Sequence, residues 1–312
     1  MFKAAFALAL LFCTTLLATE PTQTVTFNRS FGSAALPTFD RGYLLFLHHS
    51  NAIEVWGPDG QLAFETQVNN PPQAVVMSAA VDGRGAFALG VADISAGGIA
   101  FLDPSGKRIR FIATGKYLPS HVCFDADNNL WTFGWQRDSA QNGREDPEDY
   151  PLFRKYSPDG KQIGAFLSRS LFPRPGLSPG SPSGGFLRLR ISGNRIGALA
   201  YAGKRSETRE WIELALDGSL IGHWKIGREG SGSGGMAFTS SNALCRERFE
   251  SSVPHAECFD RETKAWKPVG NVALTEDNGR SLGILLGADG DDLIFGSSGG
   301  NIRLSRVQIT LP

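Results

Sequence analysis

The stretch Phe124-Asp125-Ala126-Asp127-Asn128-Asn129-Leu130-Trp131 decides the fold of this chain. Its order of apolar residue, aspartate, short polar turn and apolar run is typical of a tight connection between two β-strands. The same order recurs, more weakly in the last three copies, at Phe39–Leu44, Val81–Phe87, Phe124–Trp131, Ile191–Ile196, Phe238–Leu244 and Ala288–Leu293. The motif position that holds aspartate in the first three copies is occupied in the last three by Ser192, Thr239 and Ala288. Six copies at intervals of roughly fifty residues predict a repeat architecture.

A second turn motif lies between these copies, and its clearest form is Pro58-Asp59-Gly60. Proline presets φ for the first corner of a turn and glycine accepts a positive φ, so the motif predicts a hairpin. Related turns follow at Phe101–Lys107, Tyr156–Lys161, Leu214–Leu220 and Cys258–Lys264. Each repeat therefore holds four short strands.

Six units of four strands predict an all-β fold, a six-bladed β-propeller in which neighbouring blades bury each other's faces. Three strands follow Gly283, so we expect Thr22–Phe27 to supply the fourth strand of the last blade and close the ring. The two turn motifs resemble those of secreted bacterial six-bladed propellers of the NHL-repeat and TolB-like kind. The resemblance covers almost all of the chain after its N-terminal segment, and it implies a fold rather than a function.

The composition excludes several classes of protein. The chain has 312 residues, of which 41% are hydrophobic and 20% charged, as in an ordinary globular protein. Its 31 Lys and Arg residues balance 31 Asp and Glu residues, so the positive charge expected of a nucleic-acid-binding protein is missing. We expect a monomer with no nucleic-acid partner.

The N-terminal segment is typical of a secretory signal peptide. Lys3 supplies a positive charge, an apolar run follows, and no acidic residue appears before Glu20. The alternative is a membrane anchor, but about 14 apolar residues fall short of the roughly 20 that span a bilayer. We expect a signal peptide at residues 1–18, cleaved after Ala18, and a single propeller domain at 19–312 without a transmembrane segment. The protein is then exported to a periplasm or to the extracellular medium.

Three cysteines remain after cleavage: Cys123, Cys245 and Cys258. If the strands around Cys245 and Cys258 pair about a loop centred near residues 251–252, these two cysteines face each other directly. A disulfide there would add about 3 kcal/mol of stability by restricting the unfolded chain. Two reduced thiols between blades are the alternative. We expect Cys123 to lie buried in an inner strand.

The lengths of the connections distinguish two faces of the propeller. The tight turns join strands 1 to 2 and 3 to 4 and lie on one face, which we call the turn face. The long segments lie on the opposite, loop-rich face, at Arg137–Tyr150, Phe172–Gly180, Gly203–Arg209, Gly227–Gly235, Phe249–Ala256 and Asn271–Ser281. Binding residues concentrate on loops held by a rigid scaffold, so we expect the binding site on the loop-rich face. The acidic stretch Arg144–Asp149 lacks the residue order of a calcium loop and is expected to be a solvated loop.

Eight side chains are candidates for the binding face and the channel mouth: His48, Asp93, His121, Trp135, Arg188, Arg246, Asp277 and Arg280. No catalytic constellation and no metal-ligand spacing is present, so we predict neither a catalytic residue, nor a metal, nor a cofactor. The sequence favours an exported, non-catalytic binding protein that recognises a protein, peptide or glycan. Resemblance to other six-bladed propellers implies an alternative, a metal-dependent lactonase or lyase whose channel ion is held by some of His48, Asp93, His121 and Asp277.

Overall fold

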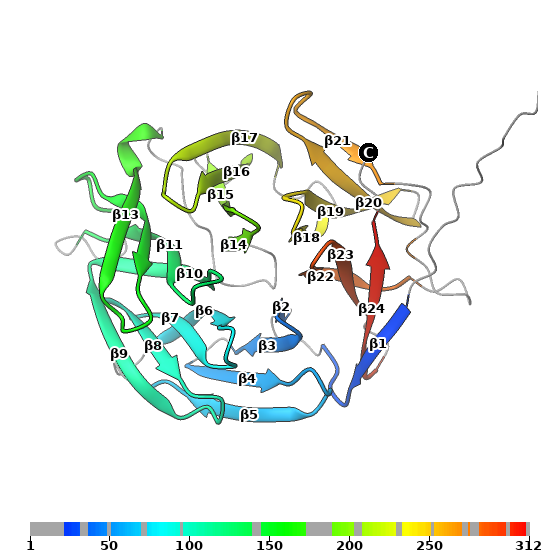
Figure 1. Ribbon diagram of the computed structural model, residues 1–312, viewed down its shortest axis with the longest axis horizontal. Helices are drawn as coiled ribbons and strands as arrows, with labels where there is room; N and C mark the ends of the chain where they lie inside the picture. Colours follow the sequence, from blue (N-terminus) through cyan, green and yellow to red (C-terminus); the bar gives the residue numbers. More distant parts are fainter. Residues whose placement is uncertain are drawn as a thin grey trace, which may run out of the picture.

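Six sheets of four antiparallel strands stand in a ring around a central axis (Figure 1). The computed structural model of the chain describes residues 22–31, 37–48, 51–69, 74–93, 96–138, 145–172, 189–202, 208–228, 233–250, 253–269, 274, 281–297 and 300–309. The predicted signal peptide lies outside these residues. Within them, no helix has the length and apolar character needed to cross a membrane. The predicted six-bladed β-propeller is confirmed.

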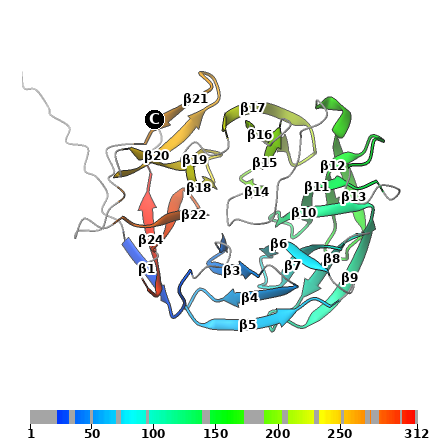
Figure 2. The ribbon, with the colours of Figure 1, turned by 180° about the vertical axis from the view of Figure 1, so that it is seen from behind.

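Each of the first five blades is four consecutive strands, the first lying nearest the axis (Figures 1 and 2). Blade one consists of β2 (Thr38–Asp40), β3 (Tyr43–Leu47), β4 (Ala52–Trp56) and β5 (Leu62–Gln67). Blade two consists of β6 (Val75–Val81), β7 (Phe87–Ala92), β8 (Gly97–Leu102) and β9 (Arg108–Gly115). Blade three consists of β10 (Tyr117–Phe124), β11 (Leu130–Gln136), β12 (Pro151–Tyr156) and β13 (Gln162–Ser168), and the 3-10 helix η1 (Arg169–Leu171) follows it. Blade four consists of β14 (Leu189–Ser192), β15 (Arg195–Ala202), β16 (Thr208–Ala215) and β17 (Leu220–Arg228). Blade five consists of β18 (Ser233–Phe238), β19 (Leu244–Glu250), β20 (Val253–Asp260) and β21 (Ala265–Pro268).

Blade six joins the two ends of the chain. It contains β22 (Ile284–Asp289), β23 (Asp292–Ser297) and β24 (Ile302–Gln308), and its outer strand is β1 (Thr22–Phe27). β1 pairs antiparallel with β24, and Phe27 is fully buried beside it. The predicted closure of the ring by the N-terminal strand is confirmed.

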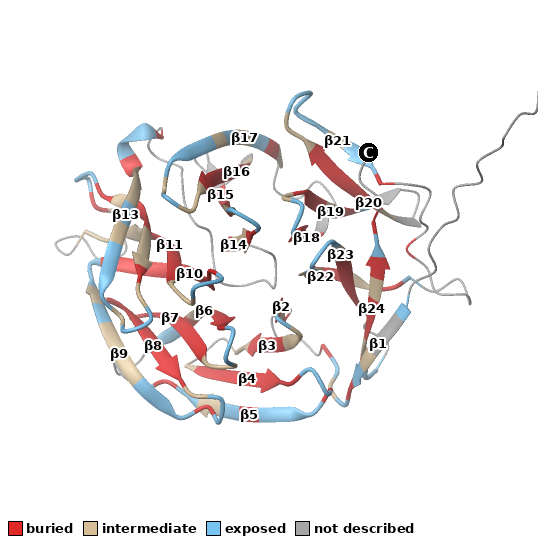
Figure 3. Ribbon diagram, in the orientation of Figure 1, coloured by how far each residue is buried: buried red, intermediate tan, exposed pale blue. Residues whose placement is uncertain are grey.

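The hydrophobic core is divided among the seams between blades. Six clusters of buried apolar residues occur among the described residues, and each draws its members from two neighbouring blades. Inner strands are therefore covered on both faces, and β10 is buried at all eight of its positions, whereas the outer strand β13 is half-buried or exposed along its length (Figure 3). Burial on both faces explains why β7 and β8, which are buried at every position, read as continuous apolar runs.

The hairpins that join strand 1 to strand 2 have two forms, which the sequence motif does not distinguish. In blades one, four and six, two residues connect the strands, as Arg41 and Gly42 do between Asp40 and Tyr43. In blades two, three and five, a longer loop is closed by backbone bonds such as Asp125 N to Asn129 O. The alignment of Ala288 with the aspartates is wrong, because Asp289 ends β22 as Asp40 ends β2.

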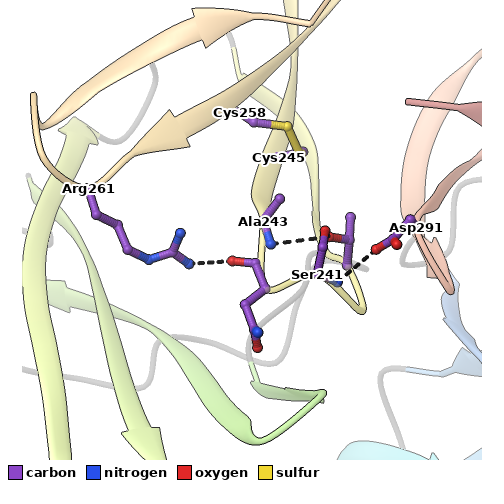
Figure 4. The surroundings of a disulfide bond; sticks show 8 residues. Ser241, Ala243, Cys245, Cys258, Arg261 and Asp291 are labelled. Carbon is purple, nitrogen blue, oxygen red and sulfur yellow. Dashed lines mark hydrogen bonds between the residues drawn. A yellow bond between two sulfur atoms is a disulfide. The ribbon is translucent and has the colours of Figure 1, made fainter. Parts of the chain in front are cut away.

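Cys245 and Cys258 form the predicted disulfide. They are directly opposite each other in β19 and β20, and the bond joins the two middle strands of blade five (Figure 4). Beside it, the backbone N–H of Ser241 donates to Asp291 of blade six (Figure 4). Cys123 has a free thiol and is buried in the inner strand β10, as expected.

Candidate functional site

Two of the predicted residues, Asp93 and Trp135, both contact Arg137 at the loop-rich ends of blades two and three. Arg137, directly after β11, lies with its guanidinium carbon 5.4 Å from the centre of the Trp135 ring. Its Nη1 donates to the backbone oxygen of Asp93, which follows β7, at 2.9 Å. Trp135 is half-buried and packs against the core cluster between blades three and four. Sequence reasoning identified Asp93 and Trp135 but missed Arg137, the residue that connects them.

The acidic stretch after Arg144 is attached to blade three through Glu145 and Asp146, while residues 147–149 are exposed, as expected of a solvated loop. Asp146 is buried, and its carboxylate accepts from Lys116 Nζ at 3.2 Å and Gln136 Nε2 at 3.1 Å. The backbone N–H of Glu148 also donates to it, and this bond does most to hold the pKa of Asp146 below its ordinary value. Burial raises the cost of an unpaired carboxylate, so these donors fix the position of the segment.

A second ion pair anchors the same segment. The Arg169 side chain is fully buried in η1 and its Nε lies 2.5 Å from Oε1 of Glu145. The Tyr150 hydroxyl donates to the same carboxylate at 2.6 Å. Residues 145–150 are thereby tied to η1 at the end of blade three, beside the strand that carries Trp135.

The two candidate histidines occupy different surroundings. His121 is buried in β10 and stacks against Phe133 with ring centres 6.3 Å apart. His48 follows β3, and its Nε2 lies 3.3 Å from Oε2 of Glu54, whose other oxygen, Oε1, accepts from Arg29 Nε at 2.8 Å. Among the described residues, no group of three or more His, Cys, Asp or Glu side chains is arranged to hold a metal ion.

The remaining candidates are not assembled around Trp135. Arg246 of β19 contacts Glu257 at 2.8 Å and lies over the Trp266 ring at 4.1 Å, so it belongs to blade five. Arg188, Asp277 and Arg280 lie outside the described residues. The metal-dependent alternative, which draws on Asp277, therefore stays a prediction.

A cavity of about 220 Å³ lies at the axis on the opposite, turn face. Five blades contribute to its walls, through Asp40, Arg41, Cys123, Phe124, Arg190, Ile191, Ser192, Gly193, Phe238, Ser240, Ala288, Asp289 and Gly290. We call it the axial cavity. Sequence reasoning missed it, because it assigned the residues of the tight turns to structure. The sequence feature that could have revealed the cavity is a charged residue, Arg190, in the inner strand of blade four.

An ion pair crosses the axis at this cavity. Arg190 of blade four places Nη1 2.8 Å from Oδ1 of Asp40 in blade one, on the opposite side of the ring. The guanidinium also donates to the backbone oxygen of Phe39, and the other Asp40 oxygen accepts from Val81 N at 2.9 Å. Burial raises the pKa of the Cys123 thiol well above its ordinary value, so this cysteine is not an activated nucleophile.

No protein-family model matches the sequence, and comparison with curated proteins gives no match. Among solved structures, the Neurospora crassa Pan2 WD40 domain is similar with a TM-score of 0.52 at 12% identity, over 94% of this chain and 97% of that chain. BamB from Moraxella catarrhalis is similar with a TM-score of 0.42 at 12% identity, over 91% of this chain and 85% of its own. A putative gluconolactonase has a TM-score of 0.46 at 11% identity, over 91% of this chain and 93% of its own. The similarity to the Pan2 WD40 domain supports the β-propeller fold, and a fold alone does not determine a function.

Proposed function

We propose that this protein is an exported, non-catalytic binding protein that recognises a protein, peptide or glycan with its loop-rich face. The observation that carries the proposal is the Trp135–Arg137 pair at the ends of blades two and three. Tryptophan and arginine are the side chains that most often dominate binding energy at interfaces. An aromatic ring with an arginine over it offers both a stacking surface and directed hydrogen-bond donors.

The residues around Trp135 and Arg137 lower the conformational entropy that these two side chains lose when a partner binds. Arg137 is held by the Asp93 oxygen, and its own backbone N–H donates to Lys116 O at 3.0 Å. Lys116 in turn contacts the buried Asp146. Side chains that are already fixed lose little conformational entropy on binding, and this raises affinity without new contacts.

The proposal is tested by screening the purified protein against a glycan array and a displayed random-peptide library, and by repeating the screen with Trp135→Ala. We expect ligands of one class to bind the wild type and to lose affinity by about tenfold or more in the variant, as for an interface hot spot. Trp224→Ala is the matched control, because Trp224 pairs with Arg261 at 5.8 Å on the outer strand of blade four. Equal loss in both variants would contradict a site at Trp135.

A metal measurement separates this function from the enzyme alternative. We expect the purified protein to carry no stoichiometric metal and its melting temperature to be insensitive to a chelator. A bound metal whose removal lowers the melting temperature would favour a lactonase or lyase over a non-catalytic binding protein, since metal binding stabilises the folded state that holds it.

A further inference from the structure

The seam between blades four and five gathers arginine side chains toward its loop-rich end. Glu257 of β20 is buried there, with its Oε2 2.8 Å from Nη2 of Arg246 and its Oε1 3.0 Å from Nη1 of Arg248. One carboxylate carries one negative charge, so the two guanidiniums that share it keep a positive charge. We propose that this end of the seam binds a sulfate or phosphate group of a ligand.

A third arginine, Arg209 of β16, faces the same end of the seam from blade four. Side chains two residues apart on a strand point to the same side of the sheet. Trp211 of β16 packs against Phe238 of blade five, with ring centres 5.3 Å apart. Arg209 is the next residue of this row toward the loop-rich face, so it faces blade five as well. Burial does most to lower the pKa of the Arg246 guanidinium, and the positive charges of Arg248 and Arg209 lower it further.

The acidic residue next to Arg209 faces away from this seam. Glu210 points to the opposite side of the sheet, where its carboxylate contacts His223. His255 is directly opposite Arg248 in the pairing of β19 and β20, and its ring adds a hydrogen-bond donor at the same end of the seam. Among the described residues, this end of the seam thus joins three arginines and a histidine to a single carboxylate.

Arg246 is held in place without using all of its hydrogen-bond donors. Its Nε and Nη2 donate to Glu257, and its guanidinium carbon lies 4.1 Å from the centre of the Trp266 ring. Trp266 is fixed in turn, because its Nε1 donates to the backbone oxygen of Ile226 in blade four at 2.9 Å. Nη1 of Arg246 makes no hydrogen bond within the described part of the chain, so a ligand can use it at little cost in conformational entropy.

Three guanidiniums suit a tetrahedral oxyanion better than a carboxylate. A sulfate or phosphate ester presents three terminal oxygen atoms, each able to accept from a different arginine, whereas a carboxylate presents two. Charge-assisted hydrogen bonds of this kind are about twice as strong as those between neutral groups. The Arg248 side chain is 52% exposed, against 15% for Arg246, so a ligand group approaches from solvent past Arg248.

Isothermal titration calorimetry of the purified protein with glucose 6-sulfate and glucose 6-phosphate tests the proposal, with glucose and acetate as further probes at the same ionic strength. We expect saturable binding of at least one ester, weaker binding of acetate and no binding of glucose. The ester that binds more tightly identifies the ligand group as a sulfate or a phosphate. Arg248→Gln should weaken ester binding by about tenfold or more, the usual effect of losing a hydrogen bond to a charged group.

Arg195→Gln is the matched control. Arg195 pairs with the buried Glu213, which Arg261 also contacts, so this variant breaks the same kind of ion pair at the turn end of the same seam. It should leave ester binding unchanged. Arg209→Gln approaches the site from blade four and should weaken ester binding as Arg248→Gln does. Circular-dichroism spectra show whether each variant is folded.

Several results would overturn the proposal. These are no binding of either ester, binding of acetate or glucose as tight as that of the esters, and equal weakening by Arg195→Gln and Arg248→Gln. Ester binding that survives both Arg248→Gln and Arg209→Gln would also overturn it. The site is separate from the Trp135–Arg137 pair, so Trp135→Ala should leave ester binding unchanged. Loss of ester binding in Trp135→Ala would place the ligand at blades two and three instead.

Discussion

The inner hairpins of blades two, three and five differ from those of blades one, four and six in what their anchor side chain does. In the first group the anchor closes its own loop. Asp82 Oδ1 accepts from the backbone N–H groups of Arg84 and Ala86, both within the turn. Asp125 repeats this pattern in blade three, and the Thr239 hydroxyl accepts from Ala243 N in blade five.

In the second group the anchor reaches another strand or another blade. Asp40 accepts from Val81 N of blade two and pairs with Arg190 of blade four. Ser192 donates to the Thr239 oxygen of blade five, and Asp289 pairs with Arg306 of the third strand of its own blade. All three anchors line the axial cavity.

The length of the turn explains the difference. A longer loop curls its amides toward the side chain at its start, as in other Asx turns. A two-residue turn has no spare amide within reach, so the same side chain is left to bond elsewhere. One sequence motif therefore stabilises single blades at three positions and connects strands or blades at the other three.

Removing a loop-closing anchor should give the largest loss of stability. Asp125 is buried and accepts from Asp127 N, Asn129 N and Trp131 Nε1, and Lys155 Nζ lies 3.1 Å away. Asp125→Ala leaves these donors, of which Trp131 is fully buried, without a partner, and we expect a loss of about 3–5 kcal/mol in unfolding free energy. Urea unfolding followed by circular dichroism measures it. Asp125→Asn keeps the shape and should lose clearly less, and equal losses would show that the charge, not the loop closure, stabilises blade three.

A buried carboxylate at the seam of blades five and six should give a smaller, pH-dependent effect. Glu247 of β19 is fully buried and accepts from Leu285 N of β22 at 3.0 Å. No oppositely charged group is paired with it among the described residues, and burial raises its pKa from 4.5 to about 6, against the opposing effect of the Leu285 and Gly235 amides. A raised pKa means that the folded state favours the protonated form, so this stabilisation is complete below pH 4.5 and is lost as the pH rises through about 6.

We expect a loss of about 2 kcal/mol across that pH window, from about 1.4 kcal/mol per pKa unit. The measurement is the difference in unfolding free energy between wild type and Glu247→Gln at the two ends of the window, because the variant cannot titrate. Asp125 should behave in the opposite way. Burial alone would raise its pKa, but bonds from Asn129, Lys155 and Trp131 hold that pKa below its ordinary value, so its contribution is lost in acid. If the difference in unfolding free energy between wild type and Glu247→Gln were the same at both pH values, Glu247 would not titrate in this window and the prediction would be wrong.

Removing a hydroxyl group that links two blades should lower the unfolding free energy by less than either of the changes above. Ser192→Ala removes one hydrogen bond to the Thr239 oxygen, which keeps a second donor in Asn242 N, so we expect about 1 kcal/mol. Ser219→Ala is the control, since Ser219 bonds Asp217 on an exposed outer turn and should lose less. Thermal unfolding compares the two. If Ser219→Ala lowered the melting temperature more than Ser192→Ala, hydrogen bonds between blades would contribute less to stability than those within the outer turns.

The smallest effect tests the turn geometry itself. Arg41 has φ 50°, a conformation that costs most side chains but not glycine, so Arg41→Gly should raise stability by about 0.5 kcal/mol. The same substitution at Arg84, on the longer loop of blade two, should lower stability, because Arg84 pairs with Asp82 and glycine gains flexibility in the unfolded chain. Melting temperatures of the two variants should move in opposite directions, and a shift in the same direction would mean that the two turns are equivalent.

Sequence patterns predicted the elements whose partners lie close in the chain. The Cys245–Cys258 pair follows from counting outward from a hairpin loop, because antiparallel pairing fixes which residues face each other. Closure of the ring by β1 is an exception, because its partner β24 lies at the other end of the chain; it followed from counting strands, since the last repeat lacks its fourth. At the loop-rich face, Trp135 and Asp93 were identifiable as an aromatic and an acidic residue at strand ends, but the role of Arg137 depends on where blade two meets blade three.

The sequence by itself determined the repeat, the strand order within each blade and the disulfide, because these depend on local turn chemistry and on the register of neighbouring strands. The tertiary structure alone decided which turn anchors face the axis and which close their own loops. Phe39 and Arg190 are 151 positions apart, and they meet because a ring of six blades sets blade four opposite blade one. The axial cavity exists through that closure, since its walls come from five blades and no one repeat contains it.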